Sequence, residues 1–491
     1  MRRDALPCRY SLGHLIMINA VVCGLELAAS VAYTYLPPLL LKAGFCSAST
    51  GFILGIGPLI AMITVPFLGR LADKSRCSLG RRRPLIFVFA CVLSTSLIII
   101  IVGQRLIKSA GEEGSYSAVG AGLIMLGGIL LDYSSQSAFN PCEALLSDLL
   151  EGGPRVTLDT GFAVYSGLLS LGGCLGYMVT AVRWPRPLSG SLLGGQEGAA
   201  CGVALTIFIA TVFATGVAAK EEPRGGAVSL SPIRPPKKEG NYFNFSFPRN
   251  QCCRAGLAIL RTLVFPVGKL LYVILGKLVL FPRDIYREVK SSPLVLQRLF
   301  AADVVSWSAI TCYNLFYTNY VGQVVYGGNP TSGVGTLHEA LYNEGVRMGS
   351  WGLLLHSITA CGYASLLQDQ MIRNYGLRWT YLCGLLTFSA CMVGILFSND
   401  INLLNLFAAF SGVFFFDIRE QRGSGADFAV LDIAYYLGQI LLSLVMSNVG
   451  QILGKPECYM VFAAIAGLTS CYFANEVIYS SSQLITLKGY S

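Results

Sequence analysis

The sequence predicts an all-α membrane protein with twelve transmembrane helices in two six-helix bundles. The first observation is the composition: 54% of the 491 residues are hydrophobic and only 13% are charged, against about 25% in soluble proteins. A mean hydropathy of +0.59 over the whole chain requires apolar runs that recur, because a soluble domain would dilute a single anchor. The other observations are the number of these runs and a motif that occurs twice. The composition argues against a soluble enzyme, and we expect no enzymatic activity.

Apolar runs of membrane length follow one another in two sets of six. The first set covers residues 13–36, 50–69, 84–104, 118–141, 160–182 and 199–219, and the second covers 299–322, 346–367, 378–397, 401–416, 427–449 and 458–479. Glycine, proline and serine inside the runs agree with membrane helices, which tolerate these residues and pack closely through small ones. The division predicts an N-terminal six-helix bundle over 1–219, a cytoplasmic linker over 220–298 and a C-terminal six-helix bundle over 299–491.

The linker begins with the charged, proline-containing stretches KEEPRG and SPIRPPKKEG, which have the composition of a disordered segment. Residues 262–281 are apolar enough to imitate a further span, but two lysines interrupt them. We favour an interfacial amphipathic helix there, because an odd number of crossings would invert the second half.

Both termini are predicted to face the cytoplasm. With this orientation, 29 of the 36 Lys and Arg residues fall in cytoplasmic segments, as the positive-inside rule requires. The same asymmetry accounts for the net charge of +9 without a nucleic-acid partner. The N-terminus lacks a convincing cleavage site and indicates an uncleaved first span. We expect a multi-pass protein of the plasma membrane, with the lipid bilayer as its partner.

The cysteines do not indicate a disulfide framework or a metal site. Ten of the 16 lie inside apolar runs, where a thiol packs as a small hydrophobe. Cys252 and Cys253 are adjacent, but no second pair or histidine cluster stands at a ligand spacing. We therefore expect no metal and no bound cofactor.

A loop motif occurs once in each half. After the second run the chain carries Gly69, Asp73, Gly80, Arg81 and Arg82, and after the eighth it carries Ser365, Asp369, Gly376 and Arg378. The small residue precedes the aspartate by four positions and the aspartate precedes the glycine by seven in both copies, so Arg378 corresponds to Arg82. This internal repeat places both loops on one face of the membrane.

The loop pattern resembles the signature of the major facilitator superfamily. The version that ends in GRRRP is similar to the branch of plant sucrose:proton symporters and animal solute carrier family 45, and the segments LGIGPLIAMITVPFLG, PCEALLSDL, SLGGCLGYM, FYTNYVG, EGVRMGS and LDIAYYLGQ extend the likeness over nearly the whole chain. The resemblance implies proton-coupled uptake of sucrose by alternating access, with glucose and fructose as further candidates. The proton is then the coupling ion.

The sequence departs from that family in two places. The tenth apolar run has only 16 residues, Ile401 to Phe416, and a short joint follows it. This length is marginal for a span, so either the bilayer adapts or a segment is missing, which puts transport in doubt. The second departure is Glu143, at a position where the sucrose symporters carry an arginine that helps to hold sugar.

Ionisable residues at bilayer depth cost at least a few kcal/mol and are functional candidates by default. Four qualify: Glu26, Asp132, His356 and Asp432. A proton-coupled carrier needs a carboxyl group whose pKa is raised toward neutrality by desolvation, and Glu26 and Asp132 are our candidates for proton coupling. The alternative for both acids is an interhelical hydrogen bond that serves only packing. For His356 a packed neutral imidazole is the favoured alternative.

A sugar site needs hydroxyl-binding groups and an aromatic face. The candidates for substrate binding are Tyr33, Tyr165, Trp307, Tyr313, Asn314 and His356, with Tyr177 and Tyr317 on the same helices. Most membrane aromatics instead pack or lie at the interface.

The repeated loop motif is interpreted as a conformational latch as well as a topology anchor. Its predicted members are Gly69, Asp73, Gly80, Arg81, Arg82, Asp148, Asp369 and Arg378. The aspartates would cap helix ends, and the arginines would pair with acids such as Asp148 across the domain interface in one state only.

The leading functional hypothesis is a proton-coupled sugar symporter. A carrier of another polar or cationic solute is the first alternative, because Glu26, Asp132 and Glu143 supply more negative charge than a neutral sugar needs. A non-transporting membrane scaffold that binds partners through the linker is the second, and the short tenth run supports it.

Overall fold

A computed structural model describes residues 11–74, 80–109, 114–150, 155–184, 193–219, 289–290, 294–332, 335–414 and 425–477. No residue in these ranges lies in a β-strand. The helices of the first half are α1 (Leu12–Lys42), α2 (Ser47–Lys74), α3 (Arg83–Ser109), α4 (Gly114–Leu150), α5 (Arg155–Ala181) and α7 (Gln196–Ala218). Those of the second half are α9 (Leu294–Tyr320), α10 (Leu337–Gly362), α11 (Gln368–Phe397), α12 (Ile401–Ser411), α13 (Gly425–Leu453) and α14 (Glu457–Glu476).

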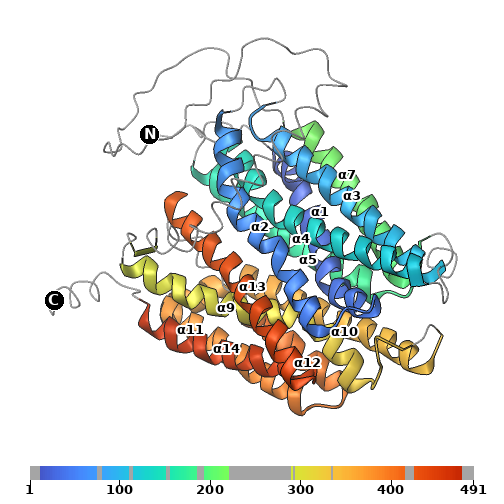
Figure 1. The fold of residues 1–491 in the computed structure, drawn as a ribbon. Helices are drawn as coiled ribbons and strands as arrows, with labels where there is room; N and C mark the ends of the chain where they lie inside the picture. The colour runs from blue at the N-terminus through green and yellow to red at the C-terminus, as the bar shows by residue number, and fades with distance from the viewer. Residues whose placement is uncertain are drawn as a thin grey trace, which may run out of the picture.

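The predicted all-α membrane fold is confirmed. Over the described ranges, nine helices are long and apolar enough to cross a membrane by length and composition. Figure 1 shows the blue-to-green helices α1–α7 on one side of the molecule and the yellow-to-red helices α9–α14 on the other. The predicted domain boundaries at residues 219 and 298 stay a prediction, because most of the linker lies outside the described residues.

The described part of the tenth helix is short. α12 has 11 residues and continues as the 3₁₀ turn η3 (Gly412–Phe414). At 1.5 to 2.0 Å rise per residue this piece is about 22 Å long, against about 30 Å for the hydrocarbon core. Residues 415–424 lie outside the described ranges. The described part of this helix is therefore shorter than the hydrocarbon core, as the short apolar run in the sequence predicts.

The glycine of the repeated motif adopts a left-handed backbone conformation in both halves. Gly80 and Gly376 both have positive φ, 108° and 82°, a conformation that glycine adopts without the steric penalty of a Cβ atom. In each half, an arginine that follows this glycine by two or three residues donates a hydrogen bond to the last helix of the same half. Arg83 donates to the carbonyl oxygen of Gly216 on α7, and Arg378 donates to the Asn475 side chain on α14 at 2.5 Å.

The two halves meet at the end of the bundle that holds Lys42, which we call the Lys42 end. The predicted topology places this end outside the cell. Here α1 lies against α9, α2 against α13 and α5 against α10. Thr318 donates to the carbonyl oxygen of Thr34 at 3.1 Å, and Ser447 donates to that of Ala48 at 2.8 Å.

The contact between α2 and α13 is made by small residues. A Cβ atom added to Gly51 would lie 3.0 Å from the backbone nitrogen of Ser447, and one added to Gly55 would lie 2.7 Å from the Cβ of Ser443. Both pairs are four residues apart and so lie on one face of their helices. The helices therefore touch backbone to backbone, in the small-residue packing that membrane helices use.

Candidate functional site

Asp132 lies at the midpoint of α4 and is 8% exposed. Its Oδ1 atom accepts a hydrogen bond from Nε2 of Gln136 at 2.5 Å. The carboxyl group also fills the space beside Gly57 of α2, where an added Cβ would lie 3.0 Å from the Asp132 Cβ and closer still to its oxygen. The glycine therefore gives the acid room inside the bundle.

Glu26 lies near the middle of α1 and points toward α5. A Cβ added to Gly172 would lie 2.9 Å from the Glu26 Cβ, and one added to Gly173 would lie 3.8 Å from its Oε1. These two glycines of α5 thus provide the surface on which this acid lies. Both predicted proton-coupling residues point into the protein.

A pair of tyrosines joins the halves beside these acids. The hydroxyl groups of Tyr33 on α1 and Tyr435 on α13 are 3.4 Å apart. Both phenols lie within electrostatic range of the Glu26 and Asp132 carboxyl groups. Trp307 on α9 packs edge-on against Tyr435, with ring centroids 4.8 Å apart and an interplanar angle of 86°. The structure therefore brings Tyr33, Trp307 and both acids together.

Buried amide groups lie on the same helices. Oε1 of Gln136 on α4, both polar side-chain atoms of Gln439 on α13 and Oδ1 of Asn314 on α9 are buried without a hydrogen-bond partner in the described part of the chain. Unmade bonds of this kind are costly, so each needs an explanation such as a ligand or water. A solute with several hydroxyl groups is one such explanation.

Sequence reasoning missed Tyr435, Gln439 and Gln136. The first two lie in the segment LDIAYYLGQ, one helical turn apart, and Gln136 is one turn from Asp132. The i, i+4 spacing was the available signal, but it does not say which residues of the other half lie opposite.

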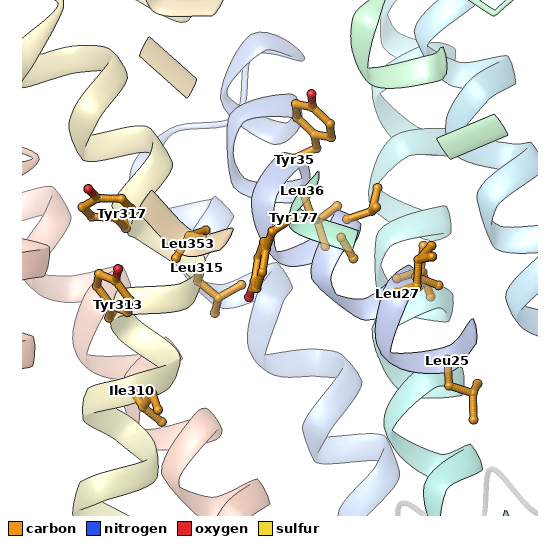
Figure 2. Packing of buried hydrophobic residues seen from close by; sticks show 14 of the residues in the cluster. Leu25, Leu27, Tyr35, Leu36, Tyr177, Ile310, Tyr313, Leu315, Tyr317 and Leu353 are labelled. Atoms are coloured by element: carbon orange, nitrogen blue, oxygen red, sulfur yellow. The ribbon is translucent and has the colours of Figure 1, made fainter. Parts of the chain in front are cut away.

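A second aromatic cluster lies in the core of the C-terminal half. The ring of Tyr313 is 5.0 Å from that of Tyr317 and 5.2 Å from that of His356. Nδ1 of His356 and Oγ of Ser411 on α12 are 2.8 Å apart. His356 thus joins α10 to α12, as expected for the packing alternative. Figure 2 shows Tyr177 between the helices of the first half and the α9 residues Tyr313 and Leu315. Tyr165 is half-buried on α5.

The arginines of the first loop pair with Asp148 as predicted, but the location of the pair differs. Arg81 lies 2.7 Å and Arg82 3.0 Å from the Asp148 carboxylate. The pair joins the loop before α3 to the end of α4, so it lies within the first half and does not cross the domain interface as expected. The physical reason is that α3 and α4 pack side by side. The side chains of Asp73 and Asp369 lie outside the described residues.

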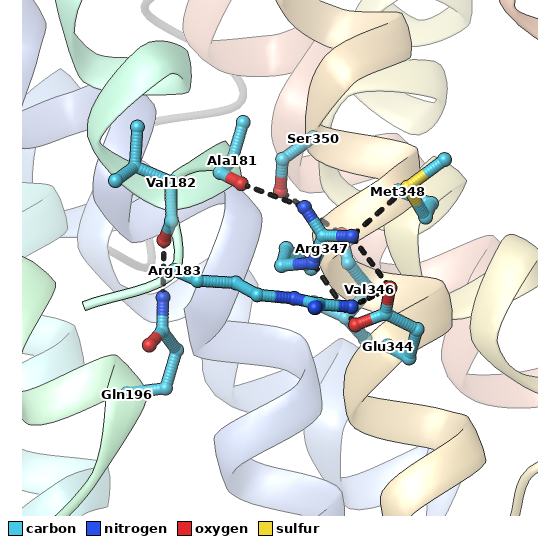
Figure 3. Close-up of polar contacts among 9 residues, drawn as sticks. All are labelled: Ala181, Val182, Arg183, Gln196, Glu344, Val346, Arg347, Met348 and Ser350. Atoms are coloured by element: carbon cyan, nitrogen blue, oxygen red, sulfur yellow. Dashed lines mark hydrogen bonds and ion pairs between the residues drawn. The ribbon is translucent and has the colours of Figure 1, made fainter. Parts of the chain in front are cut away.

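Two ionic groups link the halves at the Lys42 end. Arg183, just after α5, lies 2.6 Å from Oε1 of Glu344 on α10. Arg347 lies 2.5 Å from the same carboxylate and donates to the carbonyl oxygen of Ala181 at 3.2 Å. Figure 3 shows this fork of two guanidinium groups on one carboxylate. We call these four residues the α5–α10 clasp.

Lys42 makes the second link. It pairs with Glu197 on α7 and donates to Oδ1 of Asn343 on α10 at 2.6 Å. Together with the clasp, this link holds the Lys42 end closed in the described conformation.

The sequence is similar to several known transport proteins over nearly its whole length. No model of a protein family matches the sequence. "Solute carrier family 45 member 3" of Mus musculus is 28% identical, and that of Homo sapiens is 29% identical, with 97% of this chain and 97% of each relative covered. "Proton-associated sugar transporter A" of Rattus norvegicus is 23% identical over 96% of this chain and 87% of the relative. The alignment to the mouse protein runs over 567 positions, so the relatives contain residues that this chain lacks.

Solved structures agree on the fold. A structure described as "Structural insights into substrate recognition in proton dependent oligopeptide transporters" matches with a TM-score of 0.59 at 13% identity and covers 95% of this chain and 98% of that chain. The nucleoside transporter NupG matches with a TM-score of 0.54 at 13% identity and covers 94% and 98%. The chain is thus a multi-pass membrane protein with the major facilitator superfamily fold and a relative of solute carrier family 45 member 3.

Proposed function

We propose that this protein is a proton-coupled sugar symporter that works by alternating access, with sucrose as the first substrate to test and glucose and fructose next. One observation carries the proposal: a tyrosine pair joins the two halves within electrostatic range of two carboxyl groups at membrane depth. The relatives named as proton-associated sugar transporters agree with this chemistry.

The proposed site lies where Tyr33, Trp307 and Tyr435 meet. The indole and phenol faces offer apolar surface for the C–H groups of a sugar ring, and the hydroxyl and amide groups offer hydrogen bonds. Because the Tyr33–Tyr435 contact crosses from one half to the other, a bound solute would touch both halves at once. Solute binding is thereby able to favour one arrangement of the halves over the other.

Asp132 and Glu26 are the proposed proton carriers. A charge at this depth is costly when the site is closed to water, so the closed carrier favours neutral acids. A proton loaded from one side and released to the other would then accompany the solute. In the described conformation the α5–α10 clasp and the Lys42 link close the predicted outer side, and both must open to admit solute from there.

Uptake into liposomes tests the proposal. Purified protein with an inward proton gradient should accumulate labelled sucrose, and Asp132→Asn should abolish accumulation. Asp400→Asn is the matched control, because Asp400 is exposed and its side chain caps α12, a role that asparagine fills equally well. Uptake that ignores the gradient, or uptake of organic cations alone, would refute sugar symport. Absence of uptake for every solute would favour the scaffold alternative.

A further inference from the structure

Gln136 holds the proposed proton carrier with only one of its two polar atoms. Its Nε2 donates to Asp132 Oδ1 at 2.5 Å, while its Oε1 is buried and accepts no hydrogen bond from the described residues. The side chain is 5% exposed. The two residues are four apart on α4, on one face of the helix.

The chemistry of the two side chains makes this pairing dependent on charge. An ionised carboxylate can only accept hydrogen bonds, so the amide must turn its NH₂ group toward it. A protonated carboxyl group carries an O–H donor beside its remaining carbonyl acceptor. When the proton lies on the oxygen that faces Gln136, the amide satisfies it by turning its own oxygen inward. The amide has nearly the same shape in both orientations, so the change needs little space in a packed interior.

The ionisable groups near Asp132 do not take over the hydrogen bond that the Gln136 amide donates to it. Tyr33 on α1 and Tyr435 on α13 lie within electrostatic range of Asp132, and both also lie within that range of Glu26 on α1. On α2, the residue in contact with the carboxyl group is Gly57, which has no ionisable group. In the described structure, the side chain that donates a hydrogen bond to Asp132 is that of Gln136.

We propose that Gln136 is a proton-dependent specificity switch at the proposed sugar site. When Asp132 is charged, the amide presents an acceptor, Oε1, to the solute. When Asp132 takes up a proton from water, the amide turns and presents a donor, Nε2. The proton remains on the carboxyl oxygen, and no covalent bond of the solute changes. This inference rests on the proposed function and adds the way in which proton loading reaches the solute.

The switch selects a class of solute. A hydroxyl group is both donor and acceptor, so it keeps a hydrogen bond to the amide in both orientations. An organic cation with only N–H donors, or an anion with only acceptors, is satisfied in one orientation and loses its bond in the other. Gln136 therefore favours neutral polyhydroxylated solutes, although the site is flanked by acids.

Gln136→Met tests the switch, because methionine keeps the length of the side chain and removes both polar atoms. Removal of a donor from the charged carboxylate should move half-maximal uptake to higher pH by about one unit. The variant should also lose the preference of the wild type for the parent sugar over the deoxyfluoro analogue that lacks an O–H donor at the position facing Gln136. Gln104→Met is the matched control: Gln104 is buried on α3 and lies outside the proposed site, so its pH profile and preference should equal those of the wild type.

The outcomes separate the two proposals. Failure of the wild type to accumulate sugar on a proton gradient would refute the proposed function itself. Accumulation by the wild type, with an unchanged pH profile and an unchanged analogue preference in Gln136→Met, would refute the switch alone. If Gln136→Met is not recovered from membranes, Gln136→Asn is used. Its amide is one methylene shorter and does not reach the Asp132 carboxyl group, so the same change in pH profile and analogue preference is expected.

Discussion

The α5–α10 clasp should control how often the Lys42 end opens. Glu344→Gln removes the charge that holds Arg183 and Arg347 together. The Arg183 side chain is 71% exposed and that of Glu344 is 33% exposed, so solvent screens this pair and its contribution is well below 1 kcal/mol. Arg347 and Glu344 both lie on α10, so their pair persists when the halves separate and does not count toward the loss. We expect a loss of about 0.5 kcal/mol, which raises the population of the open Lys42 end by about twofold.

Spin-label distances measure that population. Cys46 is exposed between α1 and α2, and Leu337 is 71% exposed at the start of α10, so labels at Cys46 and Leu337→Cys report on the two halves. Cys91 and Cys383, which are also exposed, are changed to serine in this background. Glu344→Gln should enlarge the long-distance population.

Glu339→Gln is the matched control for the clasp, because Glu339 lies on the same helix and accepts from the backbone of Gly335. It should leave the distances unchanged. An identical distance distribution in Glu344→Gln and in Glu339→Gln would show that the clasp does not hold the halves together.

Two further predictions concern the glycine surface under Glu26 and the predicted topology. Gly172→Ala should lower the free energy of unfolding by about 1–3 kcal/mol and reduce uptake, because the added Cβ would overlap α1. Gly167→Ala is the control and should be tolerated, because its added Cβ would have no neighbour within 4 Å. Equal melting temperatures of the two variants would contradict this account. The hydrogen bond from Ser49 lowers the pKa of the Cys46 thiol, so more thiolate is present at neutral pH and labelling slows only as the pH falls through that lowered value. A membrane-impermeant maleimide added outside intact cells should react with Cys46 and not with a Cys46→Ser variant, and reaction only after permeabilisation would overturn the topology.

The sequence predicts the membrane-depth acids and the repeated loop for reasons that act locally. A charged group in an apolar run is conspicuous because of its cost, so the sequence predicts Glu26 and Asp132. Asp132 is buried, and Glu26 lies against the glycines of α5. Gly80 and Gly376 were found by their spacing, and both have positive φ.

Contacts between the halves are not visible in the sequence. Tyr33 and Tyr435 are 402 positions apart, and Arg183 and Glu344 are 161 apart, so no helical period connects them. For the same reason the partner of Arg81 and Arg82 was identified but was placed across the wrong boundary. Which residues of the two halves face each other depends on how rigid bundles dock, and side-chain patterns within one helix do not specify that.

The close contact between α2 and α13 determines which groups are exposed to water when the two halves separate at the Lys42 end. Gly51, Gly55, Ser443 and Ser447 have almost no hydrocarbon side chain, and Ser447 binds a backbone carbonyl. The newly opened walls would therefore be lined by hydroxyls and peptide groups, which wet readily. Such a passage fills without the dewetting barrier that rows of leucine or phenylalanine would impose, so a hydrated solute could enter while keeping much of its water until it reaches the tyrosine pair.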